Sequence, residues 1–243
     1  MPAIDIQSHA ATQVLEVELR PHGRAGVPFL DWRVTARLAA KRSQPPSAFV
    51  GASLYAVCFD KSLIYVGSYL GKSGRRGGAK AAHFEGDVVS ARWWQHFGSI
   101  TGRAHCLSVG VRTLAALQSE VGASHPMIVA LRGADGSLHK DAGCLGARSR
   151  LRLAASHFAE FNAATPEAVL SRFEYVYARV VGTPAIDAAL LARQITSAER
   201  SLVARLNPAV NGTGAQLDKP RVDVPCTGVG GQLAAALRDE LTR

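Results

Sequence analysis

Two short runs of β-forming residues, separated by a turn, constrain the fold of this chain more than any other feature. Leu54–Phe59 and Leu63–Gly67 flank Asp60-Lys61-Ser62. The pattern predicts an antiparallel hairpin with a three-residue loop. With such a loop, the odd-numbered positions of both strands share one face, so we expect Tyr55 and Tyr65 to point the same way.

Weaker signals along the rest of the chain predict a mixture of strands and helices. Further strands are expected at Val14–Leu19, Met127–Arg132 and Phe173–Val181. Helices are expected at Asp31–Lys41, Val88–Phe97, Arg112–Glu120, from Arg148, from Pro184 to about Leu206, and at about Gln232–Leu241. The predicted fold class is α+β, with a small antiparallel β-sheet flanked by helices.

The charge of the chain favours polyanionic partners. Its 243 residues carry a formal net charge of +9, and 47% of them are hydrophobic, enough for a real core. Basic side chains on phosphates release condensed counterions, which favours nucleic acid. Ribosomal and membrane-surface proteins share such a balance, so charge alone does not identify the partner.

The cysteines and the hydropathy predict an intracellular location. Cys58, Cys106, Cys144 and Cys226 are scattered, without metal-ligand spacing, and are expected to be reduced thiols. No apolar run approaches the roughly 20 residues of a membrane span, and the N-terminus lacks the order of a signal peptide. We therefore expect a cytoplasmic protein of bacterial type that does not enter a membrane.

Glu199 is the most informative single residue. Leu191, Ile195, Glu199 and Val203 follow each other at four-residue steps, which places a carboxylate in the apolar stripe of a helix. A buried charge costs several kcal/mol unless a partner neutralises it. The partner is either a core arginine or a divalent cation, unless the helix is rotated so that Glu199 lies at the rim.

Arg92 and His96 lie one helical turn apart on a predicted helix. The guanidinium is suited to phosphate oxygens, and the imidazole can exchange a proton near neutral pH. An exposed Arg/His face is common on ordinary helices, and tyrosines such as Tyr55 and Tyr65 are common in strands. Each pair alone therefore favours a structural role over a functional one.

Taken in order, these features resemble the GIY-YIG nuclease superfamily. Residues 53–55 read Ser-Leu-Tyr where the family has Gly-Ile-Tyr, and residues 65–67 read Tyr-Val-Gly where it has Tyr-Ile-Gly. An Arg-x-x-x-His helix follows at Arg92–His96, and a helix with Glu199 is followed by a proline and Asn211. The resemblance covers roughly residues 50–100 and 173–212. The long spacing from Tyr65 to Arg92 looks like the branch of type II restriction endonucleases.

The resemblance implies one-step hydrolysis of DNA at a single divalent ion, Mg²⁺ or Mn²⁺, held by Glu199. Tyr55 would deprotonate the attacking water, and His96 would orient Tyr55 or relay its proton. Arg92 would stabilise charge on the phosphate, and Tyr65 would align the water or the phosphate. Asn211 would fix the loop after the Glu199 helix.

A glycine-rich basic loop lies between the hairpin and the Arg/His helix. Lys72, Arg75, Arg76 and Lys80 in this loop are candidates for DNA binding. Arg75 also competes with Arg92 for the role of the catalytic arginine. Position 79 is not a histidine, so we prefer Arg92.

The expected organisation is an N-terminal extension at 1–47, a catalytic domain at 48–212 with an insertion at about 102–171, and a tail with a helix at 213–243. The extension and the insertion are expected to serve DNA recognition or dimerisation. The predicted function is sequence-specific cleavage of double-stranded DNA by a homodimer on a palindromic site. The alternatives are a homing, repair or structure-specific nuclease, and a catalytically silent DNA-binding protein.

Overall fold

The computed structural model describes residues 2–24, 27–37, 49–70, 87–131, 144–182, 187–211 and 223–243. The chain divides into two compact units. Unit 1 comprises Met1–Val14, Arg37–Arg92 and Ser171–Arg243, and unit 2 comprises Leu15–Ala36 and Trp93–Leu170. Each unit is therefore built from segments that are distant in the sequence.

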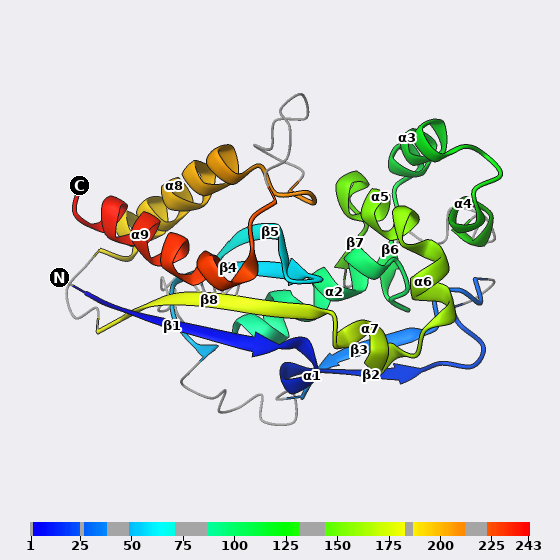
Figure 1. Ribbon diagram of the computed structural model, residues 1–243, viewed down its shortest axis with the longest axis horizontal. Coiled ribbons are helices and arrows are strands. Elements are labelled where there is room, and N and C mark those ends of the chain that lie inside the picture. Colours follow the sequence, from blue (N-terminus) through cyan, green and yellow to red (C-terminus); the bar gives the residue numbers. More distant parts are fainter. Residues whose placement is uncertain are drawn as a thin grey trace, which may run out of the picture. The chain divides into compact units, whose positions relative to one another are not determined.

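Unit 1 is built on a four-stranded antiparallel sheet (Figure 1). Its strands are β1 (Ala3–Ala10), β4 (Ser53–Phe59), β5 (Ser62–Tyr69) and β8 (Phe173–Val181), in the order β1-β8-β4-β5. The hairpin β4–β5 and strand β8 were predicted, whereas β1 was not. The sheet is small and flanked by helices, so the predicted α+β class is confirmed.

The turn between β4 and β5 is one residue shorter than predicted. Phe59 pairs with Ser62, so the turn consists of Asp60 and Lys61, with φ of 48° and 66°. Two positive φ angles in succession are the mark of a type I′ turn, which matches the twist of a hairpin. The three-residue loop of the sequence prediction is therefore wrong.

A β-bulge in the hairpin nevertheless brings the two tyrosines to one face. The register shifts between Val57 and Cys58, and beyond the shift Tyr55 pairs with Gly67 and Val57 with Tyr65. A β-bulge adds one unpaired residue to one strand, which exchanges the faces of all residues beyond it. The predicted common face of Tyr55 and Tyr65 is confirmed because the bulge compensates for the shorter turn.

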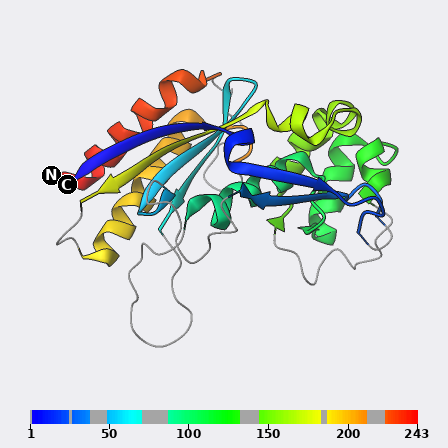
Figure 2. The same cartoon turned by 90° about the horizontal axis from the view of Figure 1, so that it is seen from below.

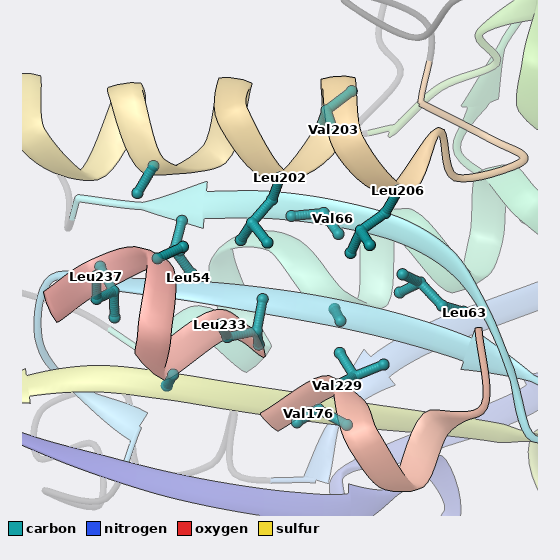
Figure 3. Packing of buried hydrophobic residues seen from close by; sticks show 14 of the residues in the cluster. Leu54, Leu63, Val66, Val176, Leu202, Val203, Leu206, Val229, Leu233 and Leu237 are labelled. Atoms are coloured by element: carbon teal, nitrogen blue, oxygen red, sulfur yellow. The ribbon is translucent and has the colours of Figure 1, made fainter. Parts of the chain in front are cut away.

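One face of this sheet is covered by two helices, α8 (Ala188–Leu206) and α9 (Val229–Leu241). Leu54, Val66 and Val176 from the strands pack there in one cluster with leucines of both helices (Figure 3). Figure 2 shows α8 and α9 side by side on this face. Each fully buried leucine contributes about 1.5–3 kcal/mol, so this layer anchors α8, the helix that carries Glu199.

A disulfide joins Cys58 in β4 to Cys226 in the short 3-10 helix η5 (Cys226–Gly228), across 168 residues of sequence. The expectation that both thiols are reduced is therefore wrong for this pair. The sequence could not reveal it, because the hairpin and the C-terminal segment meet only in the folded sheet. Ser62 also bridges Pro225, next to the disulfide.

Reduction of this disulfide is expected to lower the free energy of unfolding by about 2–5 kcal/mol, because the crosslink restricts the unfolded chain over a long loop. Urea unfolding with and without reductant measures the change. In denaturant without reductant, Cys58 and Cys226 should resist alkylation, and after reduction they should react. Alkylation of both without reductant would contradict the disulfide.

Unit 2 contains the antiparallel pair β2 (Leu15–Leu19) and β3 (Trp32–Ala36) and the parallel pair β6 (Leu107–Ser108) and β7 (Cys144–Leu145). Its helices are α2 (Trp94–Thr101), α3 (Val111–Val121), α4 (Pro126–Leu131), α5 (Arg148–Ser156), α6 (Phe158–Ala163) and α7 (Pro166–Leu170). Buried Arg103 ties its two chain segments together: Nη2 donates to both carboxylate oxygens of Asp31 at 2.7 Å, and Nη1 donates to the carbonyl of Phe161 at 2.8 Å.

Two predicted elements of unit 2 are wrong. The expected helix Asp31–Lys41 begins as strand β3, in which Trp32, Val34 and Ala36 are buried and Arg33 is exposed, a period of two rather than 3.6. The expected strand Met127–Arg132 is helix α4. A short apolar run does not distinguish strand from helix, and Pro126 together with the His125 side chain, which accepts from the Met127 amide at 3.2 Å, starts the helix.

The predicted domain boundaries differ from the two units. The N-terminal extension is divided, because strand β1 and the short helix α1 (Ala11–Val14) belong to unit 1 whereas β2 and β3 belong to unit 2. The predicted tail contributes α9 to the core of unit 1. Of the helices in the described ranges, none combines the length and apolar character required to cross a bilayer.

Candidate active site on the hairpin strand β5

The two tyrosines of the hairpin lie next to each other over Gly67. The ring centroids of Tyr55 and Tyr65 are 6.0 Å apart, and Tyr55 is buried whereas Tyr65 is half-buried. A Cβ at position 67 would lie 2.7 Å from the Tyr55 hydroxyl and 2.7 Å from Cε1 of Tyr65. Glycine is therefore required here so that both phenols can lie against the backbone of β5.

Gly67→Ala is expected to displace both phenol rings. Overpacking of a well-packed site costs about 1–3 kcal/mol of folding free energy, and any activity that requires the two hydroxyls should fall further than stability does. Thermal unfolding measures the first effect. Gly230→Ala in α9, whose Cβ would lie 2.8 Å from an Ile6 methyl, is the overpacking control away from the phenols. Unchanged stability in Gly67→Ala would contradict the close packing of the rings.

Glu199 on α8 is half-buried, and the Ser68 hydroxyl on β5 donates a hydrogen bond to its carboxylate. Burial raises the pKa of Glu199, opposed by the Ser68 hydrogen bond and by the charges of Arg200 and Arg92. The carboxylate thus lies at the rim of the apolar stripe, with two basic residues within electrostatic range. This arrangement favours neither full burial nor a single fixed ion-pair partner.

Glu199 meets strand β5 on the face opposite the two phenols. Side chains alternate between the two faces of a strand, so Ser68, the partner of Glu199, shares a face of β5 with Val66. Tyr65 and Gly67 occupy the opposite face. The mechanism that the resemblance implies requires the carboxylate and the phenols to reach the same phosphate. Glu199 and the two phenols approach β5 from its two sides, one residue apart along the strand.

Arg92 and His96 do not lie on one regular helix. Val89–Trp93 forms a π-helix, η3, which continues directly into α2 from Trp94, so the predicted helix at Val88–Phe97 is present and part of it is π-helical. Arg92 is exposed and ends unit 1, whereas His96 is 4% exposed and belongs to unit 2. A four-residue step stays close to one full turn in a π-helix as in an α-helix, so the common face of Arg92 and His96 remains a prediction.

Arg92 acts electrostatically at the end of β5. Its charge lowers the pKa of Tyr69 and that of Glu199, although burial raises both. Tyr69 lies on the phenol face and Glu199 on the opposite face, and β5 is the edge strand of the sheet. One guanidinium is therefore within electrostatic range of a group on each face of β5.

Asn211 fixes the loop that follows α8 onto the open edge of β5. Its side-chain oxygen accepts from the Val66 amide at 2.9 Å, and its side-chain nitrogen donates to the Val66 carbonyl at 2.7 Å. The neighbouring Val210 amide donates to the Ile64 carbonyl, at the bulge, at 2.9 Å. Asn211 thus satisfies backbone groups that an edge strand leaves unpaired, which holds the site strand in register.

Three residues at this end of the site were not predicted: Ser68, Tyr69 and Asp87. Asp87 is 8% exposed, caps the π-helix by accepting from the Ser90 amide at 2.7 Å, and contributes, after burial, to raising the pKa of Tyr69. Tyr69 could have been found, because it continues the odd-numbered series 65, 67, 69. Ser68 carries no sequence signal of its own.

The residues present fit one kind of divalent cation site. Within the described ranges, no three His, Cys, Asp or Glu side chains gather into a cluster. Magnesium is commonly held by one or two carboxylates, with water and substrate phosphate completing its shell, and Glu199 with the Ser68 hydroxyl suits that mode. The basic-loop candidates Lys72, Arg75, Arg76 and Lys80 lie outside the described residues.

Comparison of the chain with protein-family models, curated proteins and solved structures gives no match. The GIY-YIG resemblance consequently rests on the motifs and on the arrangement of their residues.

Proposed function

We propose that this protein is a metal-dependent DNA endonuclease of the GIY-YIG type, and specifically a type II restriction enzyme. One observation carries the proposal. A half-buried carboxylate and two packed phenols lie along strand β5, with Glu199 hydrogen-bonded one residue from the glycine beneath the phenols and the Arg92 guanidinium within electrostatic range of Glu199. Phosphodiester hydrolysis requires a carboxylate that binds a metal ion, a positively charged side chain that binds the phosphate, and a group such as a phenol that accepts a proton.

In the proposed mechanism, Glu199 holds Mg²⁺ or Mn²⁺, and Ser68 orients the carboxylate through its hydrogen bond. The ion supplies Lewis-acid stabilisation of charge at the scissile phosphate. Arg92 neutralises developing charge on the same phosphate, and Tyr55 removes a proton from the attacking water, while Tyr65 aligns it. The role of His96 rests on the motif alone.

Incubation of the protein with mixed double-stranded DNA and Mg²⁺, followed by sequencing of the ends, tests the activity. A restriction enzyme yields discrete fragments with one sequence at every cut. Nicking at branches, gaps or single strands would instead assign a repair, homing or structure-specific nuclease. Intact DNA under all these conditions, with folded protein, would refute the nuclease proposal.

The homodimer, the palindromic target and the cytoplasmic location belong to the same proposal. Two-fold symmetry in a protein matches a two-fold symmetric DNA site. A reducing cytoplasm would keep Cys58 and Cys226 as thiols, so the alkylation experiment described above, applied to protein taken directly from cells, tests the location.

A second candidate is a DNA-binding protein without catalytic activity. The position of Glu199 on the face of β5 opposite the phenols favours it, because a metal-held phosphate must reach both groups. DNA retention without cleavage, unchanged by Mg²⁺, would identify this function.

A further inference from the structure

Unit 2 contains an open cavity that the proposed site does not use. Its volume is about 520 Å³, and its walls include Arg20, His22, Trp32, Arg33, Trp94 and His105. Pockets of roughly 300–1,000 Å³ hold small organic ligands. All of these residues lie within unit 2, so the cavity is complete in one compact part of the chain.

The cavity is basic on one side. Arg20 and Arg33 both contact Glu18, at 3.5 and 3.3 Å, so two guanidiniums share one carboxylate. Burial lowers the pKa of His105, and the charges of Arg24, Arg20 and Arg33 lower it further. Positive charge therefore predominates around a histidine that stays neutral near neutral pH, a setting that favours an anion.

Aromatic surface lines the same cavity. Trp32 is 1% exposed, stacks on Phe97 at 6.0 Å, and lies beneath the Arg103 guanidinium at 4.7 Å, so it is rigidly held. Trp94, the first residue of α2, is half-buried and also lines the cavity. A flat heterocycle gains stacking energy on such a surface.

The backbone that carries Trp32 and His105 in the cavity wall, and the neighbouring Arg24, are fixed by hydrogen bonds. The His105 amide donates to the Trp32 carbonyl at 2.7 Å, and the Trp32 amide donates to the Arg103 carbonyl at 3.1 Å. Nη1 of Arg24 donates to the Leu107 carbonyl at 2.9 Å. Such bonds reduce the conformational entropy lost when a ligand binds.

We propose that this cavity binds a nucleotide, with the heterocycle against Trp94 and the phosphate toward Arg33 and Arg20. The nucleotide is either a free mononucleotide or the 5′-phosphorylated end of a DNA strand, since both present the same groups. This binding is separate from the proposed cleavage and does not depend on it.

Intrinsic fluorescence reports on binding directly, because the chain has 3 tryptophans, and two of them, Trp32 and Trp94, line the cavity. The protein is titrated in EDTA with each of the four deoxynucleoside 5′-monophosphates, the matching nucleosides, and a single-stranded oligonucleotide with and without a 5′-phosphate. Free tryptophan controls for absorption by the bases. We expect saturable quenching, with each phosphate-bearing ligand bound at least about tenfold more tightly than its unphosphorylated counterpart.

Arg33→Gln is expected to weaken binding about tenfold or more, and Arg148→Gln is its matched control. Both arginines are exposed, at 52% and 55%, lie in unit 2 and pair with a glutamate, but Arg148 is outside the cavity. Trp94→Leu, measured by calorimetry after thermal unfolding has verified its fold, should weaken binding roughly 5- to 100-fold through lost stacking.

Quenching by monophosphates assigns the free nucleotide, and quenching by the phosphorylated oligonucleotide alone assigns the strand end. The proposal is overturned if neither binds, if nucleosides bind as tightly as nucleotides, or if Arg33→Gln matches Arg148→Gln. Repeating the titration with the Glu199→Gln protein keeps the result independent of cleavage, so that either proposal can fail alone.

Discussion

Glu199→Gln is expected to reduce Mg²⁺-dependent DNA cleavage on the order of a thousandfold or more, while DNA binding is largely retained. The neutral amide cannot neutralise a divalent ion, and loss of several kcal/mol of charge stabilisation corresponds to that factor. The Ser68 hydroxyl can still donate to the amide oxygen of the new side chain, so the fold should persist. Cleavage rates and gel-shift affinities measure the two effects.

Glu174→Gln is the matched control for this substitution. Glu174 is also half-buried in unit 1 and also accepts a hydrogen bond from a serine on a neighbouring strand, Ser8 of β1. Its replacement should leave cleavage unchanged. Metal-dependent turnover by Glu199→Gln at the rate of the Glu174→Gln protein would remove Glu199 from the metal site.

Tyr55→Phe is expected to slow cleavage roughly 10²- to 10⁴-fold, the range that a positioned general base contributes. The substitution removes one hydroxyl and keeps the ring that packs beside Tyr65 over Gly67. The free energy of unfolding should therefore change little, which separates a chemical role from a structural one. Single-turnover cleavage rates and urea unfolding of the same samples provide the measurements.

Tyr175→Phe controls for the loss of a buried phenol hydroxyl. Tyr175 is fully buried, pairs through its backbone with Val57, and lies on the same face of the sheet as Tyr55. Its loss should not affect catalysis. If Tyr55→Phe cleaves DNA at the wild-type rate, the base is another group, and the same substitution at Tyr65 is the next test.

The sequence correctly predicted that Tyr55 and Tyr65 share a face of the hairpin, but only because two features that it did not reveal cancel each other. The type I′ turn is one residue shorter than the expected loop, and the bulge before Cys58 adds that residue back. Both errors concern single residues, yet either one alone would have placed Tyr65 on the other face. A strong β pattern identifies strands, whereas register depends on contacts such as that of Val210 with Ile64, far away in sequence.

The candidate site was predictable in its residue types but not in its geometry. The apolar stripe around Glu199 correctly indicated a carboxylate at a helix–sheet interface. The Ser68 hydrogen bond, which determines the face of β5 that Glu199 meets, depends on how α8 lies across the sheet. Likewise, the π-helical turn at Val89–Trp93 lies within a helix whose sequence pattern is that of a regular α-helix, so the pattern could not reveal it.

Strand β1 has a consequence for the way the protein is made. It pairs along its whole length with β8 and contacts α9, so its partners belong to the last third of the chain. At a synthesis rate of roughly 5–20 residues per second, β1 emerges from the ribosome on the order of ten seconds before β8. During that interval an unpaired, apolar strand could pair with other chains and start aggregation. In β1, polar residues at positions 5, 7 and 9 (Asp5, Gln7 and His9) alternate with other residues, so hydropathy did not predict this strand. The same polar side chains keep the newly synthesised strand soluble until β8 has been made.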